Sequence, residues 1–216
     1  MSAHPAEPLW DELHAIALAW GETIQDAEVG GFRAAAASTA EVRDALNAGY
    51  ALQTQLRRLK QRVRVGMVAQ RETSLGQGGA SLTRERLTEY QRAMGRWAAL
   101  LDDLEHLFES METAIRRLER HLGSATYIYA LSDPDTGEVR YVGKADDPRR
   151  RLGEHLNSPT NEDMAAWLEA LASQGKQPDL EVLEVVTDGD WAQKEARHIW
   201  RMRRMGFNLL NRDGPS

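Results

Sequence analysis

One helical repeat constrains the fold of this chain more than any other feature of its 216 residues. Between residues 87 and 122, apolar side chains recur at alternating steps of three and four. The positions are Leu87, Tyr90, Met94, Trp97, Leu101, Leu104, Phe108, Met111, Ile115, Leu118 and Leu122. A spacing of about 3.5 residues, held for about five heptads, predicts a long helix over about 82–122 with a coiled-coil seam. So narrow an apolar stripe needs a partner helix to bury it.

The partner for this seam can come from the same chain. A second helix is predicted over about 39–72, and it has its own seam of apolar or small residues: Ala45, Gly49, Leu52, Leu56, Leu59 and Val63. A glycine-rich loop at 73–80 joins the two helices, so they can pair as an antiparallel hairpin over about 39–122. A second copy of the chain is the competing partner. It would give a homodimer through the helix 82–122 seam, and the two arrangements are compatible.

Another helix is predicted before this pair, over about 9–28. Its apolar positions are again three or four residues apart: Trp10, Leu13, Ala17, Trp20 and Ile24. Gly30 and Gly31 are expected to end it. Residues 1–122 are therefore predicted to form an all-α region.

The periodicity changes after Gly123 and Ser124. A run of β-branched and aromatic residues over 126–131 predicts a strand. Next come a turn sequence, Asp133–Gly137, and a second short strand over 138–143. These segments together predict a β-hairpin.

The rest of the chain mixes helices with one more strand. Helices are predicted over about 148–156, 161–174 and 191–205, and a strand over 180–186. The chain is thus assigned to the α+β class, with an N-terminal helical, coiled-coil region over 1–122 and a small compact domain over 125–213.

Composition narrows the classes of protein that fit. The chain has no cysteine, which excludes disulfides and thiolate zinc sites. No apolar run approaches the roughly 20 residues of a membrane span, and no signal peptide is visible, so we expect a cytoplasmic protein without a membrane partner. The net charge of −6 argues mildly against strong non-specific nucleic-acid binding, which needs clustered cations. Local basic clusters nevertheless occur at 57–64, 149–151 and 201–204.

Chemically reactive side chains converge on the predicted hairpin. Alternate residues of a strand share one face, so Tyr127 and Tyr129 point the same way, and Tyr141 on the paired strand can lie beside one of them. Gly143 ends the second strand, where the lack of a side chain lets a ligand or a backbone approach closely. Lys144 follows directly and places positive charge next to the hydroxyl groups.

The helix after the hairpin adds two further polar groups. Arg151 and His155 are four residues apart and therefore share a helix face. Tyrosine hydroxyls beside cations and a histidine suit a phosphodiester substrate. Its hydrolysis needs a proton acceptor for water, cations against the developing negative charge and often a metal at the leaving oxygen.

The order and spacing of these residues resemble the GIY-YIG endonuclease family. Tyr127-Ile128-Tyr129 is similar to the first tripeptide of the family and Tyr141-Val142-Gly143 to the second. Four further positions of its pattern are matched by Arg151, His155, Glu195 and Asn208. Asn211 lies near enough to compete for the asparagine position. The resemblance covers about 125–213 and departs at Tyr127, where the family usually has glycine, so that an extra ring can reshape the groove.

The resemblance implies a three-stranded antiparallel sheet flanked by helices. It also implies one divalent metal, Mg²⁺ or Mn²⁺, held by Glu195 together with water and phosphate oxygens. Tyr129 becomes the candidate general base, provided that Lys144 and Arg151 lower its pKa from a reference value of about 10.

The remaining roles follow from the same resemblance. Tyr141 would position water or phosphate, and it can exchange roles with Tyr129. Arg151 would stabilise charge on the scissile phosphate. His155 would relay a proton or bind the phosphate, and Asn208 would brace the site.

Two functions from different classes fit these features. The first is a metal-dependent DNA endonuclease whose helical region positions the nuclease, either by dimerising or by gripping DNA through the 57–64 cluster. The alternative is a coiled-coil scaffold or nucleic-acid-binding protein with an inactive nuclease-like domain. The net acidity and the departure at Tyr127 favour the alternative, whereas the completeness of the polar set favours the enzyme.

Overall fold

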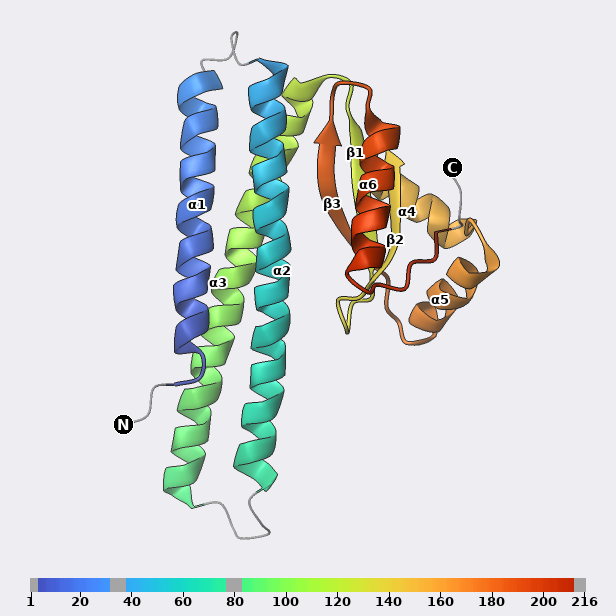
Figure 1. Ribbon diagram of the computed structural model, residues 1–216. Coiled ribbons are helices and arrows are strands. Elements are labelled where there is room, and N and C mark those ends of the chain that lie inside the picture. Colours follow the sequence, from blue (N-terminus) through green and yellow to red (C-terminus); the bar gives the residue numbers. More distant parts are fainter. Residues whose placement is uncertain (1–3, 32–37, 77–82, 212–216) are drawn as a thin grey trace.

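Three long helices form the N-terminal part of the computed structural model, which describes residues 4–31, 38–76 and 83–211. Helices α1 (Glu7–Gly31), α2 (Thr39–Gly76) and α3 (Arg84–Leu122) run up, down and up along one another (Figure 1). The tips of α2 and α3 extend beyond the start of α1 (Figure 1). Part of the predicted glycine-rich loop, 77–80, lies outside the described residues, whereas 73–76 continue α2 as helix.

The seam of α3 is buried inside this bundle. Its buried members are Trp97, Leu100, Leu104, Met111, Ile115, Leu118 and Leu122. Gly66 of α2 lets the Trp97 ring approach, because a Cβ at Gly66 would lie 2.4 Å from that ring. The repeat predicted that Leu101 is buried, but Leu101 is only partly buried and its neighbour Leu100 is fully buried. The buried face shifts in this way because α1 and α2 both contact α3. Among the seam residues only Leu87 is exposed, and from Trp97 onwards they are buried or partly buried within one chain.

The C-terminal part is built on a three-stranded antiparallel sheet. Its strands are β1 (Thr126–Ser132), β2 (Val139–Ala145) and β3 (Asp179–Val186), in the spatial order β2-β1-β3. The Asp133 carboxylate closes the hairpin by accepting hydrogen bonds from the backbone amides of Asp135 and Thr136. Gly137 completes the turn with a φ of 70°, a conformation that glycine adopts without steric cost.

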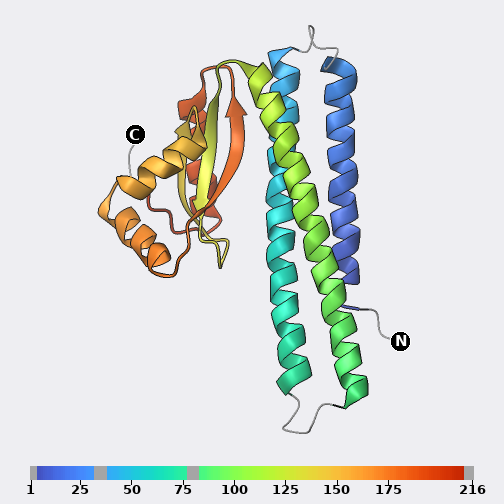
Figure 2. The same ribbon diagram turned by 180° about the vertical axis from the view of Figure 1, so that it is seen from behind.

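Helices cover both faces of the sheet. Helices α4 (Pro148–Asn157) and α5 (Glu162–Ser173) lie on one face, and α6 (Trp191–Arg204) lies on the other (Figures 1 and 2). On the α6 face, Ile128, Ala130 and Val142 pack with Ile199 and Met202. On the opposite face, the side chains that pack together are Tyr129, Leu131, Tyr141, Leu152, Met164 and Leu168. The α+β prediction is therefore confirmed.

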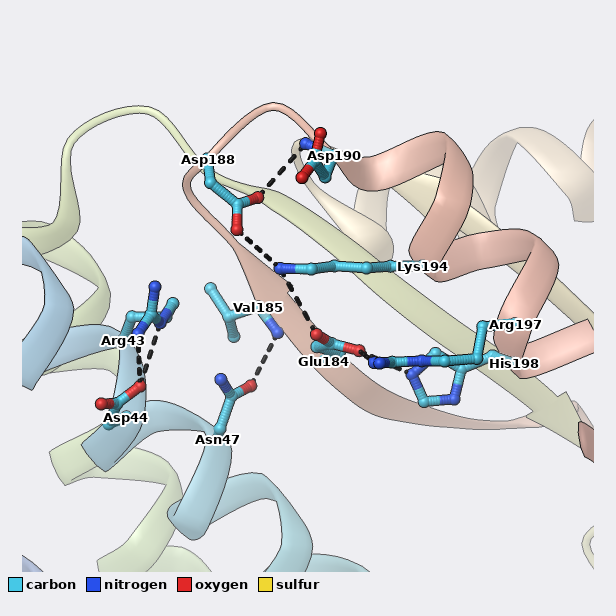
Figure 3. A network of polar contacts seen from close by, with 10 residues as sticks. All are labelled: Arg43, Asp44, Asn47, Glu184, Val185, Asp188, Asp190, Lys194, Arg197 and His198. Carbon is cyan, nitrogen blue, oxygen red and sulfur yellow. Dashed lines mark hydrogen bonds and ion pairs between the residues drawn. The ribbon is translucent and has the colours of Figure 1, made fainter.

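The bundle packs along the outer edge of β3. The Asn47 side chain on α2 accepts a 2.7 Å hydrogen bond from the backbone amide of Val185 (Figure 3). The Thr54 hydroxyl on α2 donates to the Glu181 carboxylate, and Val182 and Val185 belong to the bundle core. Covering an edge strand in this way removes a site for unwanted strand pairing. Within the described ranges, no helix is both long and apolar enough to cross a membrane.

Candidate active site

A buried tyrosine–histidine pair forms the centre of the site. The hydroxyl oxygen of Tyr129 on β1 lies 2.8 Å from Nε2 of His155 on α4. The exposed fraction is 0% for Tyr129 and 1% for His155. Burial, followed by the neighbouring Arg151, lowers the pKa of His155, so the imidazole is neutral at pH 7. With its one proton on Nδ1, the neutral ring can accept at Nε2 a hydrogen bond from the Tyr129 hydroxyl.

Gly143 makes room for this pair. It lies opposite Tyr129 in the β1–β2 register. A Cβ on Gly143 would lie 2.9 Å from the Tyr129 hydroxyl oxygen and 2.7 Å from Cε1 of Tyr141. Both distances are shorter than real contacts of that kind, so any larger residue would displace the tyrosines. The glycine at the end of the second tripeptide is thus required by close packing inside the site.

Tyr141 completes an aromatic cluster on the same face of the sheet. Its ring lies edge-on to His155 with 5.1 Å between the ring centroids, and 6.2 Å from the ring of Tyr129. Tyr141 is partly exposed whereas Tyr129 is buried. The structure therefore brings Tyr129, Tyr141 and His155 together as the sequence predicted, with Tyr141 nearer to solvent.

The sequence expectation about the acidity of Tyr129 is wrong. Burial is the largest influence and raises the pKa of both Tyr129 and Tyr141. Arg151 lowers both pKa values but does not outweigh burial, and Glu195 raises both further. Lys144 acts elsewhere, because its ammonium lies 2.9 Å from the centroid of the Trp191 ring. Tyr129 is therefore held as a neutral phenol in hydrogen-bond contact with His155.

Arg151 is held by a neighbouring carboxylate. Its guanidinium makes a 2.8 Å ion pair with Glu154, and Arg150 binds the other oxygen of the same carboxylate. The pair is solvent-accessible, so it is weak and exchangeable. Sequence reasoning missed Glu154, although its spacing of three residues from Arg151 on one helix was a usable signal.

Glu195 is a buried carboxylate on the inner side of α6. Its exposed fraction is 7%, and its side chain has no hydrogen-bond or ion-pair partner in the part of the chain that the structure describes. Arg197 and His198 could have neutralised it, but both bind Glu184 of β3 instead, at 2.7 and 2.9 Å (Figure 3). Burial raises the pKa of Glu195, and Lys144 offsets this only in part.

This carboxylate fits a divalent cation. A hard cation favours carboxylate oxygen and can keep most of its own water ligands, and a buried anion without a partner gains most from such a cation. Among the described residues, no group of three His, Asp or Glu side chains could hold a metal. A metal held by Glu195 would therefore have at most two ligands of these types from the described residues, with solvent and substrate supplying the other oxygens.

The other residues that the sequence assigned to the site lie at its margins. Tyr127 shares a face with Tyr129, but its ring packs edge-on against Tyr50 of α2, at 6.4 Å between centroids. The expected extra ring in the groove thus lies in the interface with the bundle. Asn208 is exposed, and its side chain has no hydrogen bond to any described residue.

Asn211 takes the bracing position. Its side-chain amide donates to the Val142 carbonyl at 2.6 Å, and its side-chain carbonyl accepts from the Val142 amide at 3.0 Å. The neighbouring Leu210 amide bonds to the Arg140 carbonyl at 2.6 Å. The chain after α6 thus pairs with the outer edge of β2 and fixes the strand that carries Tyr141 and Gly143. Of the two asparagines, Asn211 is the one that the structure places against the site.

Comparison with known proteins supports the resemblance of the C-terminal part to the GIY-YIG family. Residues 125–208 match the family model described as the GIY-YIG catalytic domain. Proteins of this family are nucleases that act on DNA. No curated protein and no solved structure matches the chain.

Proposed function

Because residues 125–208 form a GIY-YIG catalytic domain, we propose that this protein is a metal-dependent DNA endonuclease that hydrolyses phosphodiester bonds. The observation that supports this most directly is the buried carboxylate of Glu195, which has no hydrogen-bond or ion-pair partner among the described residues. Its charge raises the pKa of both Tyr129 and Tyr141. A carboxylate in that state destabilises the folded protein unless a cation binds it.

Glu195 would hold Mg²⁺ or Mn²⁺, which when bound would neutralise charge on the phosphate and its leaving oxygen. This role is compatible with the pairing of Arg197 and His198 to Glu184, since neither cation competes for the carboxylate. Lys144 lowers the pKa of Glu195 and so favours its ionised form, which a metal requires.

Tyr129 and His155 would together accept the proton from water. Tyr129 alone is a poor base, since burial raises its pKa and so keeps the hydroxyl protonated at pH 7. As water attacks phosphorus, its proton would pass to the Tyr129 oxygen while the Tyr129 proton passes to Nε2 of His155, over the 2.8 Å contact. The tyrosine ends the step neutral, and the histidine becomes the imidazolium. Tyr141, which is closer to solvent, would orient the water or a phosphate oxygen.

Arg151 would stabilise the charge on the scissile phosphate. A guanidinium can bind two phosphate oxygens at once. Its pair with Glu154 must first exchange for the phosphate, which the exposure of both groups permits. Gly143 and Asn211 would keep the tyrosines in place and would not touch the reacting atoms.

The helical bundle would position the nuclease rather than grip DNA through the 57–64 cluster. Arg57 lies over the Phe108 ring, and burial lowers its pKa. Lys60 and Arg62 are paired with Glu105 and Glu12 within the bundle. A homodimer through the 82–122 seam remains part of the proposal, and Leu87, which is 42% exposed, lies at the end of the seam most open to a partner.

The test is cleavage of supercoiled plasmid DNA by the full-length protein with Mg²⁺ or Mn²⁺. Glu195→Ala should abolish cleavage while leaving the circular dichroism spectrum unchanged. Glu162→Ala, which removes an exposed carboxylate on α5 of the same domain, is the matched control and should cut like the wild type. Cleavage by Glu195→Ala at the wild-type rate would contradict the proposal. Wild-type protein that binds DNA without cutting it would favour the alternative of a binding or scaffold protein.

A further inference from the structure

Helix α6 differs in charge from the rest of the molecule. It carries five lysines and arginines and a single carboxylate, Glu195, in a chain whose net charge is −6. That carboxylate is buried, so α6 shows no acidic side chain to solvent. In Figure 1, α6 lies in front of the sheet, and no described element covers its outer side. A polyanion is the partner that this charge distribution favours.

The outer side of α6 combines cations with an exposed indole. Arg197, Trp200, Arg201 and Arg204 follow one another at steps of three, one and three, which places them on one helix face. We call these four residues the α6 outer face. Trp200 is 60% exposed even though the Arg204 guanidinium lies 5.1 Å from its ring centroid. The Arg201 guanidinium has no hydrogen-bond or ion-pair partner in the described ranges.

From these observations we propose that the α6 outer face binds an unpaired segment of the DNA substrate, with Trp200 stacking on a base and Arg201 and Arg204 binding phosphates. Aromatic rings with flanking cations bind single strands in this way, since every base offers a ring face to stack on. A fully paired duplex hides its base faces inside the stack. The proposal rests on the nuclease function above and specifies its substrate class as DNA with a single-stranded segment.

The position of the face relative to Glu195 favours a single strand. Glu195 points toward the sheet, and the α6 outer face lies on the opposite side of the same helix. A strand that reaches both must pass around a helix about 10 Å across. A flexible single strand can follow such a path. Duplex DNA, with a persistence length of about 150 base pairs, cannot bend so sharply without a large cost.

The test compares three fluorescein-labelled DNAs in EDTA, where no cleavage occurs: an oligothymidylate, a blunt duplex, and that duplex with a single-stranded tail. Trp200→Leu should weaken binding of the tailed and single-stranded DNAs about tenfold, while Trp200→Phe should retain most of it. Arg201→Ala should also weaken binding and reduce its salt dependence. Arg92→Ala, which removes an exposed cation on α3, is the matched control and should bind like the wild type.

Several outcomes would overturn this inference. Wild-type affinity of Trp200→Leu for tailed DNA would do so, and so would an equal loss on the blunt duplex. If DNA binding does not depend on Trp200 but binding of anionic vesicles does, the face belongs to a membrane interface. If self-association depends on Trp200 instead, the face binds a second copy of the chain. The nuclease proposal is tested separately by plasmid cleavage. A protein that cuts the tailed DNA with Mg²⁺ without any dependence on Trp200 contradicts only the inference, and one that binds tailed DNA through Trp200 but cuts neither plasmid nor tailed DNA contradicts only the nuclease.

Discussion

Tyr129 and His155 share one hydrogen bond, 2.8 Å long, in a part of the domain where both side chains are buried. Burial changes the acidity of the two partners in opposite directions. It raises the pKa of the phenol and lowers the pKa of the imidazole, because it disfavours the charged form of each. The neutral pair is therefore the resting state, and the histidine is the group able to receive a proton.

The pH dependence of cleavage should reflect this pair. His155 must be neutral to accept a proton, and its pKa lies below the ordinary value of 6.5. As the pH falls from 8, the single-turnover rate with saturating metal should therefore drop to half of its plateau only below pH 6.5. Tyr129→Phe should lower the rate at least about a hundredfold at every pH. A decline that begins well above pH 7 would show that another group supplies the base.

Gly143→Ala should damage the site through packing alone. The new methyl group would collide with Tyr129 and Tyr141, so the free energy of unfolding should fall by about 1–3 kcal/mol and cleavage should fall more than tenfold. Gly153→Ala on α4 is the matched control, because a Cβ there meets nothing within 4 Å. It should raise stability by about 0.5–1 kcal/mol, since alanine favours helix. Equal effects of the two substitutions in urea unfolding would contradict this account of Gly143.

Asn211 should matter more than Asn208. Asn211→Ala would leave the amide and carbonyl of buried Val142 without partners, at a cost of about 1–3 kcal/mol in the free energy of unfolding. It should also raise the rate of amide hydrogen exchange at Val142 and lower cleavage, since β2 carries Tyr141. Asn208→Ala should change neither quantity by a measurable amount. The reverse order, with Asn208→Ala the more damaging change, would return the bracing role to Asn208.

The sequence predicted those parts of the fold and site that depend on local periodicity. Alternation along a strand put Tyr127 and Tyr129 on one face of the hairpin, and the paired strand could place Tyr141 beside one of them. A four-residue step put Arg151 and His155 on one face of a helix. Long-range contacts could not be predicted in this way. Nothing local indicates that Glu184 takes Arg197 and His198 away from Glu195, because those groups are brought together only when β3 and α6 pack.

Burial was the second limit on prediction from sequence. The cations near Tyr129 were visible in the sequence, and Arg151 does lower its pKa. The direction of the net shift is nevertheless set by how much of the ring the fold covers. The Tyr127 ring shows the same limit, since its place against Tyr50 depends on how the bundle docks on the sheet.

Glu154 should compete with the substrate for Arg151. Glu154→Gln removes the charge that holds the guanidinium while keeping the shape of the side chain. KM for DNA should therefore fall about two- to fivefold, as expected for an exposed and weak ion pair, with little change in kcat. The effect should shrink in high salt, which screens the pair. A rise in KM would instead indicate that Glu154 orients Arg151 for the phosphate.

Glu195→Gln should make the protein more stable in EDTA while removing its response to metal. The pKa of Glu195 in the folded protein lies above its ordinary value, so the folded state holds this proton more tightly than the unfolded chain. The stability that the protonated form contributes is present below pH 4.5 and is lost as the pH rises through the folded-state pKa. At pH 7 the bare carboxylate thus destabilises the fold, and a neutral glutamine removes that cost.

The melting temperature measures both parts of this prediction. In EDTA at pH 7, Glu195→Gln should melt on the order of 2 °C above the wild type. Added Mn²⁺ should raise the melting temperature of the wild type, because a ligand that binds only the folded state stabilises it, and should leave Glu195→Gln unchanged. Glu162→Gln, at an exposed carboxylate on α5, is the control and should keep the full response to Mn²⁺. An equal Mn²⁺ response in wild type and Glu195→Gln would place the metal elsewhere.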